Sequence, residues 1–192
     1  NQLAILLHRR GQYSEAERHY RESIGIYEDR LGTDNVATAN ARTNLAAVLR
    51  DRGNSAAAES LYREVLADLR AALPSDHVDV ADALLGLGQA LVDQNRAAAA
   101  DSLLQRALSI RQRVLPAGDW RIAEAQAARG RCLTARRQYE EAESLLRDSY
   151  TLLRNQRDAS DRQVQTVRRY LTALYEAWNK PEQADAFRSA SS

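Results

Sequence analysis

Alanine returns at a fixed interval along this chain. Five alanines lie 42 residues apart, at Ala16, Ala58, Ala100, Ala142 and Ala184. The residues around them follow the same step, as in the series Leu3, Leu45, Leu87, Arg129 and Leu171. Repetition at one period, without insertion or deletion, indicates an array built from a single supersecondary unit.

The repeated unit is predicted to be a pair of helices. Between Asn44 and Leu66, apolar residues recur at helical spacing on both sides of a turn at Gly53-Asn54. A small residue at one place in each unit lets two helix backbones approach closely while larger side chains interlock around it. One such pair cannot bury its apolar face alone, but stacked copies bury a continuous core. We therefore predict an all-α solenoid of antiparallel helix pairs.

The period also predicts the organisation of the chain. We expect one array over residues 1–192, with repeats at about 1–34, 35–76, 77–118 and 119–160 and a C-terminal repeat over 161–192. Asp34 is expected to cap the helix that follows Gly32-Thr33, and Ser14 with Glu17 has the spacing of a capping box. Asn1 falls partway through a first helix in this frame, and the chain lacks methionine, so we expect a piece of a longer protein.

Composition argues against several classes of partner. Lys plus Arg is 27 and Asp plus Glu is 26, which gives a formal charge of +1 and no strong field to recruit nucleic acid or an anionic membrane. No apolar run approaches the roughly 20 residues that a membrane-spanning helix needs, so no membrane contact is expected from this stretch. Aromatic residues make up only 6% of the chain, which fits thin packing of helix on helix.

The residues that usually carry chemistry show no reactive arrangement. Cys132 is the only cysteine, and we expect it to be a small, partly buried residue rather than a reactive thiol. His8, His19 and His77 do not have the spacing of metal ligands. No nucleophile, base and oxyanion donor converge by spacing. We therefore predict no catalytic, cofactor-binding or metal-binding residue and no enzymatic activity in this stretch.

The pattern around the central alanine resembles a known family. Leu45, Ala46, Leu49, Ala58 and Tyr62 stand where tetratricopeptide repeats have their characteristic residues, and the likeness covers essentially the whole chain. The joint from Leu73 to Ala81 is similar to that of the 42-residue kinesin-light-chain type, in which the histidine at the place of His77 packs and caps. The resemblance implies a right-handed superhelix of helix pairs.

The sequence departs from the tetratricopeptide pattern at three places. The early tryptophan is replaced by Arg42, Leu84, Gln126 and Arg168, and the proline after the second helix by Glu28, Arg70, Gln112 and Arg154. Without that proline the second helix can continue, which accounts for the longer repeat. The turn glycine is replaced by Asn95, Arg137 and Asn179.

The C-terminal segment from Leu171 to Arg188 is similar to the last repeat of tetratricopeptide regions that follow a bacterial serine/threonine protein kinase domain. This likeness implies an alternative function, a regulatory or substrate-recruiting module of such a kinase. The compartment is left open by the sequence. It is cytoplasmic by default and extracytoplasmic if the chain is attached to a membrane-spanning kinase.

The family likeness also implies a binding groove, because the first helix of each tetratricopeptide unit lines the concave surface. The inward positions that the leucine and alanine series leave open are candidates for peptide binding: Asn40, Thr43, Asn44, Arg50, Gln89, Arg131 and Arg169. Carboxamides can hold a peptide backbone through paired donors and acceptors, whereas arginines would select acidic groups. The alternative is that these are ordinary solvent-facing polar residues.

The leading functional hypothesis is a protein–protein interaction scaffold that binds a peptide or a partner protein, and acidic ligands are the ones that its arginines would favour. No cofactor is expected. The arginine pairs Arg9-Arg10, Arg136-Arg137 and Arg168-Arg169 are interleaved with acids, which argues against nucleic-acid binding. Self-association through a truncated N-terminal repeat is a further expectation, since Leu3, Ile5 and Leu6 would then be exposed.

Overall fold

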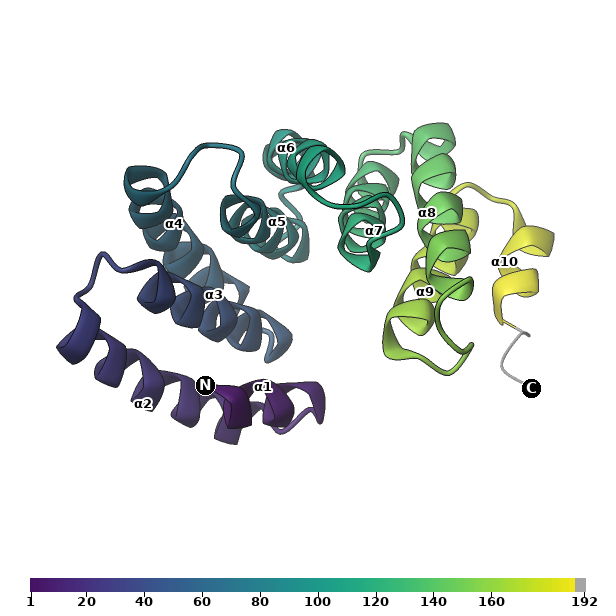
Figure 1. The fold of residues 1–192 in the computed structure, drawn as a ribbon. Coiled ribbons are helices and arrows are strands. Elements are labelled where there is room, and N and C mark those ends of the chain that lie inside the picture. Colours follow the sequence, from purple (N-terminus) through teal and green to yellow (C-terminus); the bar gives the residue numbers. More distant parts are fainter. Residues whose placement is uncertain (189–192) are drawn as a thin grey trace. The chain divides into compact units, whose positions relative to one another are not determined.

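The computed structural model describes residues 1–188 and folds them into ten helices without a strand (Figure 1). The prediction of an all-α fold of antiparallel helix pairs is confirmed. The helices are α1 (Gln2–Arg9), α2 (Tyr13–Leu31), α3 (Val36–Asp51), α4 (Ser55–Ala72), α5 (Val78–Asp93), α6 (Ala97–Val114), α7 (Trp120–Ala135), α8 (Tyr139–Arg154), α9 (Arg162–Ala177) and α10 (Pro181–Arg188). Residues 189–192 of the expected C-terminal repeat lie outside the described residues.

The chain forms two compact units, unit 1 over Asn1–Gln94 and unit 2 over Asn95–Ser192. Within each unit a helix packs mainly against the helix before it and the helix after it. The first helices of successive pairs also contact one another, α3 with α5 in unit 1 and α7 with α9 in unit 2. Each unit therefore brings two first helices side by side.

All five residues of the alanine series are completely buried. Their burial fits the expected role of a small residue at the helix crossing, where neighbouring large side chains interlock. Two glycines of the first helices also lie close to a neighbouring second helix, Gly86 of α5 to α4 and Gly130 of α7 to α8. A Cβ on Gly86 would overlap the ring of Tyr62, and one on Gly130 would overlap Leu146. These helix pairs leave no space for larger residues at the crossings.

The turn inside each pair has a left-handed residue at one repeated position. Gly11 and Gly53 occupy it in the first two pairs, with φ of 76° and 87°. Asn95, Arg137 and Asn179 adopt the same conformation, with φ of 61°, 61° and 58°. In the second pair the amide of Asn54 then donates to the carbonyl of Leu49, which satisfies a group that the helix end would leave unpaired. The turn survives the loss of glycine, with strain that is greatest for arginine.

The first helix of each later pair begins at a repeated capping residue. The side chains of Asn35, His77, Asp119 and Asp161 each accept a hydrogen bond from the amide two residues on. His77 is thus a cap, as expected. The prediction that Asp34 caps α3 was wrong by one residue, because Asn35 is the residue with extended backbone directly before the helix.

The expected capping box at Ser14 and Glu17 does not form. The second helix α2 already begins at Tyr13, so Ser14 lies inside its first turn, and its N-cap is Gln12. Glu17 is buried instead and forms ion pairs with Arg52, directly after α3, and with Arg21 of α2. Its carboxylate ties two neighbouring pairs together rather than closing a helix end.

Arg129 interrupts the leucine series without opening the core. Its guanidinium lies 3.5 Å from Oδ1 of Asp101 and 2.7 Å from Oε1 of Glu141. Asp101 also pairs with Arg136. Two carboxylates from the flanking second helices therefore neutralise a charge at a position that is apolar in the other repeats.

Candidate interaction surface

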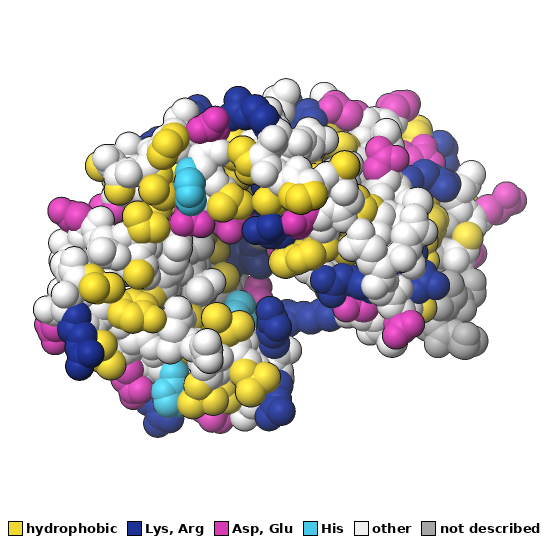
Figure 2. All heavy atoms as spheres, in the orientation of Figure 1, with side chains coloured by type: hydrophobic (Ala, Val, Ile, Leu, Met, Phe, Trp, Pro, Cys, Tyr) yellow, Lys and Arg dark blue, Asp and Glu magenta, His cyan; other side chains and the backbone are white. Residues whose placement is uncertain are grey.

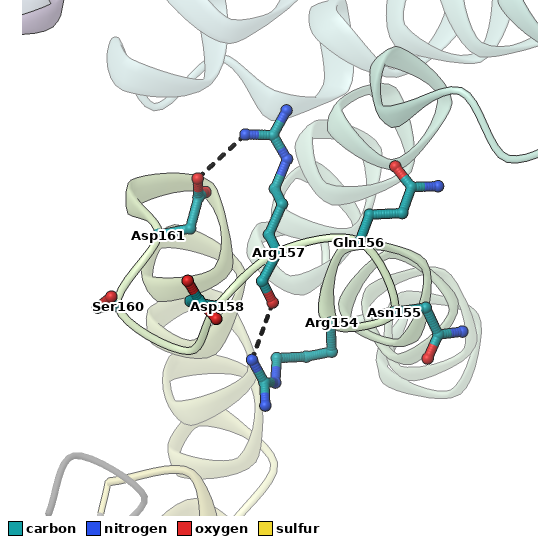
Figure 3. A pocket seen from close by; sticks show the side chains of 7 residues that line it. All are labelled: Arg154, Asn155, Gln156, Arg157, Asp158, Ser160 and Asp161. Atoms are coloured by element: carbon teal, nitrogen blue, oxygen red, sulfur yellow. Dashed lines mark hydrogen bonds and ion pairs between the residues drawn. The ribbon is translucent and has the colours of Figure 1, made fainter.

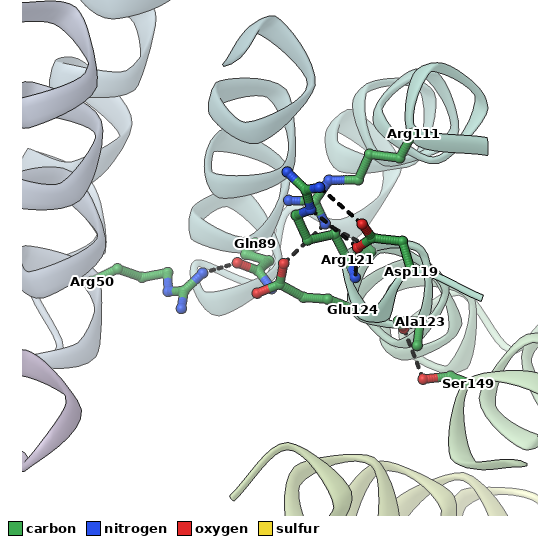
Figure 4. A network of polar contacts seen from close by, with 8 residues as sticks. All are labelled: Arg50, Gln89, Arg111, Asp119, Arg121, Ala123, Glu124 and Ser149. Atoms are coloured by element: carbon green, nitrogen blue, oxygen red, sulfur yellow. Dashed lines mark hydrogen bonds and ion pairs between the residues drawn. The ribbon is translucent and has the colours of Figure 1, made fainter. Parts of the chain in front are cut away.

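In unit 1 the candidate residues lie on α3 and α5, and most of them bind within the protein. The Nδ2 atom of Asn40 donates to Oδ2 of Asp79 over 3.1 Å. Arg50 donates through Nη1 to Oε1 of Gln89 (Figure 4). These two bonds connect the first helices of successive repeats at both ends of their shared face. These bonds already engage the side chains of Asn40, Arg50 and Gln89 within the protein.

Arg50 is also surrounded by carboxylates. Its Nη2 lies 2.9 Å from Oδ1 of Asp51, and its Nε lies 3.9 Å from Oδ2 of Asp93. Asp51 forms a further hydrogen bond of 2.9 Å with Nε2 of His8 on α1. Burial opposes the charge on Arg50, but Tyr62, Asp51 and Asp93 hold its pKa above the ordinary value. Arg50 is thus neutralised within the protein and is a poor selector of acidic ligands.

The same contacts act on the pKa of Asp51. Burial by itself would raise that pKa, but the hydrogen bond from His8 and the neighbouring Arg50 lower it to about 2. A carboxylate stabilised in this way stays ionised near neutral pH. His8, Asp51 and Arg50 therefore form a polar chain that runs from α1 to α3 and on to α5.

Two candidate residues on α3 differ from this pattern. The hydroxyl of Thr43 donates to the carbonyl of Ala39 in its own helix, over 3.0 Å. Asn44 is half-buried, and its carboxamide has no hydrogen-bond partner among the described residues. A half-buried amide with unused donors and acceptors is well suited to contact a peptide backbone. Asn44 is the strongest of the candidates in unit 1.

In unit 2 the two candidate arginines lie on α7 and α9. The guanidinium of Arg131 on α7 lies over the ring of Tyr170 on α9, 5.6 Å from its centroid. Arg169 is exposed, and its Nη2 is 3.4 Å from the hydroxyl of Thr166 one turn earlier. Within residues 1–188 no carboxylate pairs with Arg169, in contrast to the acids around Arg50. Arg169 thus leaves a positive charge at the surface of α9.

Glutamate side chains on the same two helices bind other partners. Arg111 of α6 is almost fully buried and donates to Oε2 of Glu124 over 2.9 Å and to the carbonyl of Arg121 over 2.6 Å (Figure 4). Glu176 pairs with Arg188 of α10. The buried Arg111 was not foreseen from the sequence, because its partner lies across the turn that joins two repeats.

Ser149 is another buried polar residue that the sequence did not point to. Its hydroxyl donates to the carbonyl of Ala123 over 2.7 Å and so connects α8 to α7 (Figure 4). Since this bond satisfies the hydroxyl with a backbone carbonyl inside the pair, we assign Ser149 a structural role.

A hollow of about 570 Å³ lies at the turn between α8 and α9 (Figure 3). Polar side chains line it, and the contacts in it are local: Arg157 pairs with Asp161 over 3.0 Å, and Arg154 donates to the carbonyl of Arg157 over 3.0 Å. It is wide open to solvent and has no apolar floor, unlike the concave sites that hold small molecules. We do not assign it a ligand.

The single cysteine and the potential metal ligands do not form a reactive or metal-binding arrangement among the described residues. Cys132 is buried, its Sγ lies 3.2 Å from the carbonyl of Ala97, and burial raises the pKa of the thiol to about 11. No group of three or more potential metal ligands occurs within residues 1–188. Over the same residues no helix is both long enough and apolar enough to cross a membrane.

The arginine pairs are partly engaged inside the protein. Arg168 is buried and donates to the carbonyl of Phe187 over 2.7 Å, where it binds the end of α10. Arg136 is paired with Asp101. Only part of each of these two pairs is thus available to an external phosphate.

Two family models match the chain, and both are described as tetratricopeptide repeat. One covers residues 1–71 and the other residues 80–120. A comparison with curated proteins gives no significant match. The predicted likeness to repeats that follow a bacterial kinase domain is not among these findings and stays a prediction.

Solved structures that are similar to this chain include repeats of kinesin-light-chain-like proteins. Two structures of nearly identical TPR-like repeats come from a putative kinesin light chain of Podosopora anserina. One of them, a variant with a single substitution, has a TM-score of 0.73 at 20% identity and covers 98% of this chain and 89% of its own. The other gives 0.70 at 20%, covering 99% and 93%. BtubC (BKLC) from P. vanneervenii gives 0.73 at 19%, covering 96% and 74%. At such identities the likeness concerns the fold.

Proposed function

Because the chain belongs to the tetratricopeptide-repeat family, we propose that it is a protein-interaction scaffold that binds a peptide segment of a partner through the polar faces of its first helices. Tetratricopeptide repeats bind protein partners, which supports this role. The observation that supports a peptide site is the half-buried carboxamide of Asn44, which has no partner among the described residues.

The two units are proposed to contribute different chemistry. On α3 of unit 1, Asn44 can pair with a backbone amide of an extended peptide whatever its sequence. On α9 of unit 2, Arg169 can bind a carboxylate through forked hydrogen bonds. Preference for acidic ligands therefore rests on unit 2, since Asp51 and Asp93 neutralise Arg50 in unit 1.

The test is selection of random peptides displayed on phage against the immobilised chain, followed by titration of the enriched peptides. We expect acidic peptides among those enriched. Asn44→Ala should weaken the peptides that bind unit 1, and Arg169→Ala those that bind unit 2, each by about tenfold, the effect of losing a good hydrogen bond. Arg106→Ala is the matched control, because Arg106 is an exposed arginine on the second helix α6.

Circular dichroism of each variant checks that helicity is kept. Failure to enrich any peptide, or enriched peptides that bind both variants as tightly as the parent chain, would contradict the proposed site. The regulatory role beside a kinase domain has no supporting observation in the structure and is not proposed as a second function.

A further inference from the structure

The first helix α1 exposes two leucines whose equivalents in α3 are buried. Leu3 and Leu6 are 52% and 46% exposed. Their equivalents 42 residues on, Leu45 and Val48, are 7% and 0% exposed. Figure 2 shows hydrophobic side chains at the surface over α1 and α2. The apolar stripe of Leu3 and Leu6 on α1 is therefore exposed, whereas a preceding helix, α2, buries the equivalent stripe on α3.

Residues of α2 bury the equivalent stripe on α3. Leu45 and Val48 pack in one core cluster with Ala16, Tyr20 and Ile24 of α2. The covering helix thus presents a small residue, an aromatic four residues later and an aliphatic residue four further on. This spacing forms one face of a helix.

A charge contact at the edge of that interface also repeats. Arg52, at the end of α3, pairs with Glu17 of α2. Arg136, at the end of α7, pairs with Asp101 of α6. The covering helix supplies the acid in both cases, and the acid directly follows the small residue of that helix. The contact is a second, electrostatic part of the same interface.

Arg10 stands at the corresponding place after α1, 42 residues before Arg52. It is exposed, and it forms no ion pair among the described residues. Leu3, Leu6 and Arg10 thus reproduce the receiving half of the α2–α3 interface, apolar stripe and cation together.

We propose that α1 is a docking surface for an amphipathic helix. The face of this helix that contacts α1 carries a small residue and an acid directly after it. An aromatic residue follows four positions after the small residue, and an aliphatic residue four positions after the aromatic one. The helix lies on α1 as α2 lies on α3, with its acid paired to Arg10. This surface is separate from Asn44, Arg131 and Arg169 and does not depend on the proposed peptide site.

A second copy of the chain offers no suitable helix within its described residues. The second helices α2, α4, α6 and α8 are engaged with their own neighbours. In α10, Ala184 and Asp185 fit the pattern, but Arg188 stands where α2 has Tyr20, and it pairs with Glu176 and Asp185. The face chemistry favours a helix other than the described helices of this chain, and self-association becomes an outcome of the test.

The probe is a stapled helical peptide with the sequence of α2, Tyr13–Leu31, labelled for fluorescence anisotropy and titrated into the full chain. We expect saturable binding below about 1 mM. Leu3→Glu with Leu6→Glu should weaken it by at least about tenfold, because two leucines lose their burial. Val114→Glu is the matched control, since it places the same charge on an exposed apolar residue of unit 2.

A charge exchange tests the register of the complex. Arg10→Glu should weaken binding by about fivefold, and a peptide with Glu17→Arg should recover most of that loss on the Arg10→Glu protein. No saturable binding, binding that is insensitive to the leucine substitutions, or a charge exchange that fails to restore affinity would each overturn the proposal. A dimer in sedimentation equilibrium that Leu3→Glu dissociates would overturn it in favour of a second copy.

Discussion

At the scale of single residues, two positions of the repeat restrict which residue can stand there, one through packing and the other through backbone conformation. The alanine series needs a small side chain, because all five members are completely buried where helices cross. The turn position needs a left-handed backbone, which glycine supplies at Gly11 and Gly53 and which Arg137 adopts with strain. Stability should therefore respond in opposite directions to substitutions at these two kinds of position.

Ala58→Leu should destabilise unit 1 by about 1–3 kcal/mol, because the added side chain overpacks the crossing of α3 and α4. The free energy of unfolding from urea titration measures this change. Ala56→Leu, on the exposed side of the same helix, should alter it by less than about 0.5 kcal/mol. Equal effects of the two substitutions would show that burial of Ala58 does not limit the packing.

Arg137→Gly should stabilise the chain by about 1 kcal/mol, because glycine adopts φ of 61° without a Cβ clash and Arg137 is exposed. The urea midpoint of unfolding should rise. Arg137→Ala is the control, since alanine keeps the strained Cβ and removes only the charge. A gain for alanine as large as that for glycine would assign the effect to charge instead.

At the scale of elements, α1, α3 and α5 are joined by a polar chain rather than by apolar contacts alone. Asp51 at its centre takes a hydrogen bond from His8 of α1 and from Arg50 of its own helix, and Arg50 reaches Gln89 of α5. Removing one member of such a chain leaves a partly buried partner without its counter-charge. The packing of these helices should therefore depend on pH.

The folded-state pKa of Asp51 is about 2, below the ordinary value of 3.8. Its ionisation therefore stabilises the folded state above about pH 4, and this contribution is lost as the pH falls toward 2. The loss should amount to about 2 kcal/mol. Urea unfolding at a series of pH values measures it.

The comparison that isolates this carboxylate is Asp51→Asn, which should show a correspondingly smaller loss as the pH falls through the same range. Asp29→Asn, an exposed position on α2, should retain the loss of the parent chain. If Asp51→Asn and the parent lose stability in parallel over this range, the polar chain does not hold the pKa of Asp51 low.

At the scale of the whole molecule, the described helices of each unit pack mainly against their neighbours in sequence. Stability in such an array is approximately a sum of local terms and nearest-neighbour interfaces. A defect in one helix should therefore spread to adjoining helices first.

Leu146→Ala tests this locality, because Leu146 is completely buried in α8 and packs against Gly130 of α7. The substitution should destabilise by about 2–5 kcal/mol, and amide hydrogen exchange should accelerate in α7, α8 and α9. Helices α1, α2 and α3 should keep most of their protection. A uniform loss of protection over the described residues would indicate a single cooperative unit instead.

Much of the fold follows from local information. The apolar spacing, the alanine series and the turn residues repeat every 42 residues, so each helix and each turn can be placed from its own segment. The errors were also local. Asn35, and not the predicted Asp34, caps α3. Ser14 lies inside α2, which begins at Tyr13, so the predicted capping box does not form.

The candidate surface was predictable only as a set of positions. The sequence identified Asn40, Asn44 and Arg50 as equivalent polar residues on a first helix, but it did not distinguish the bound Asn40 and Arg50 from Asn44, which has no partner among the described residues. The same holds for Leu3, whose exposure contrasts with the burial of its equivalent Leu45.

By itself the sequence determined the helices, their pairing and the positions of the crossings, because periodicity and small residues act between neighbouring turns of chain. Only the tertiary structure decided which polar side chains form hydrogen bonds or ion pairs within the protein and which do not. Long side chains such as Arg50 and Arg111 reach partners on other helices, 39 and 13 residues away in sequence, and their choice depends on which groups packing brings within reach.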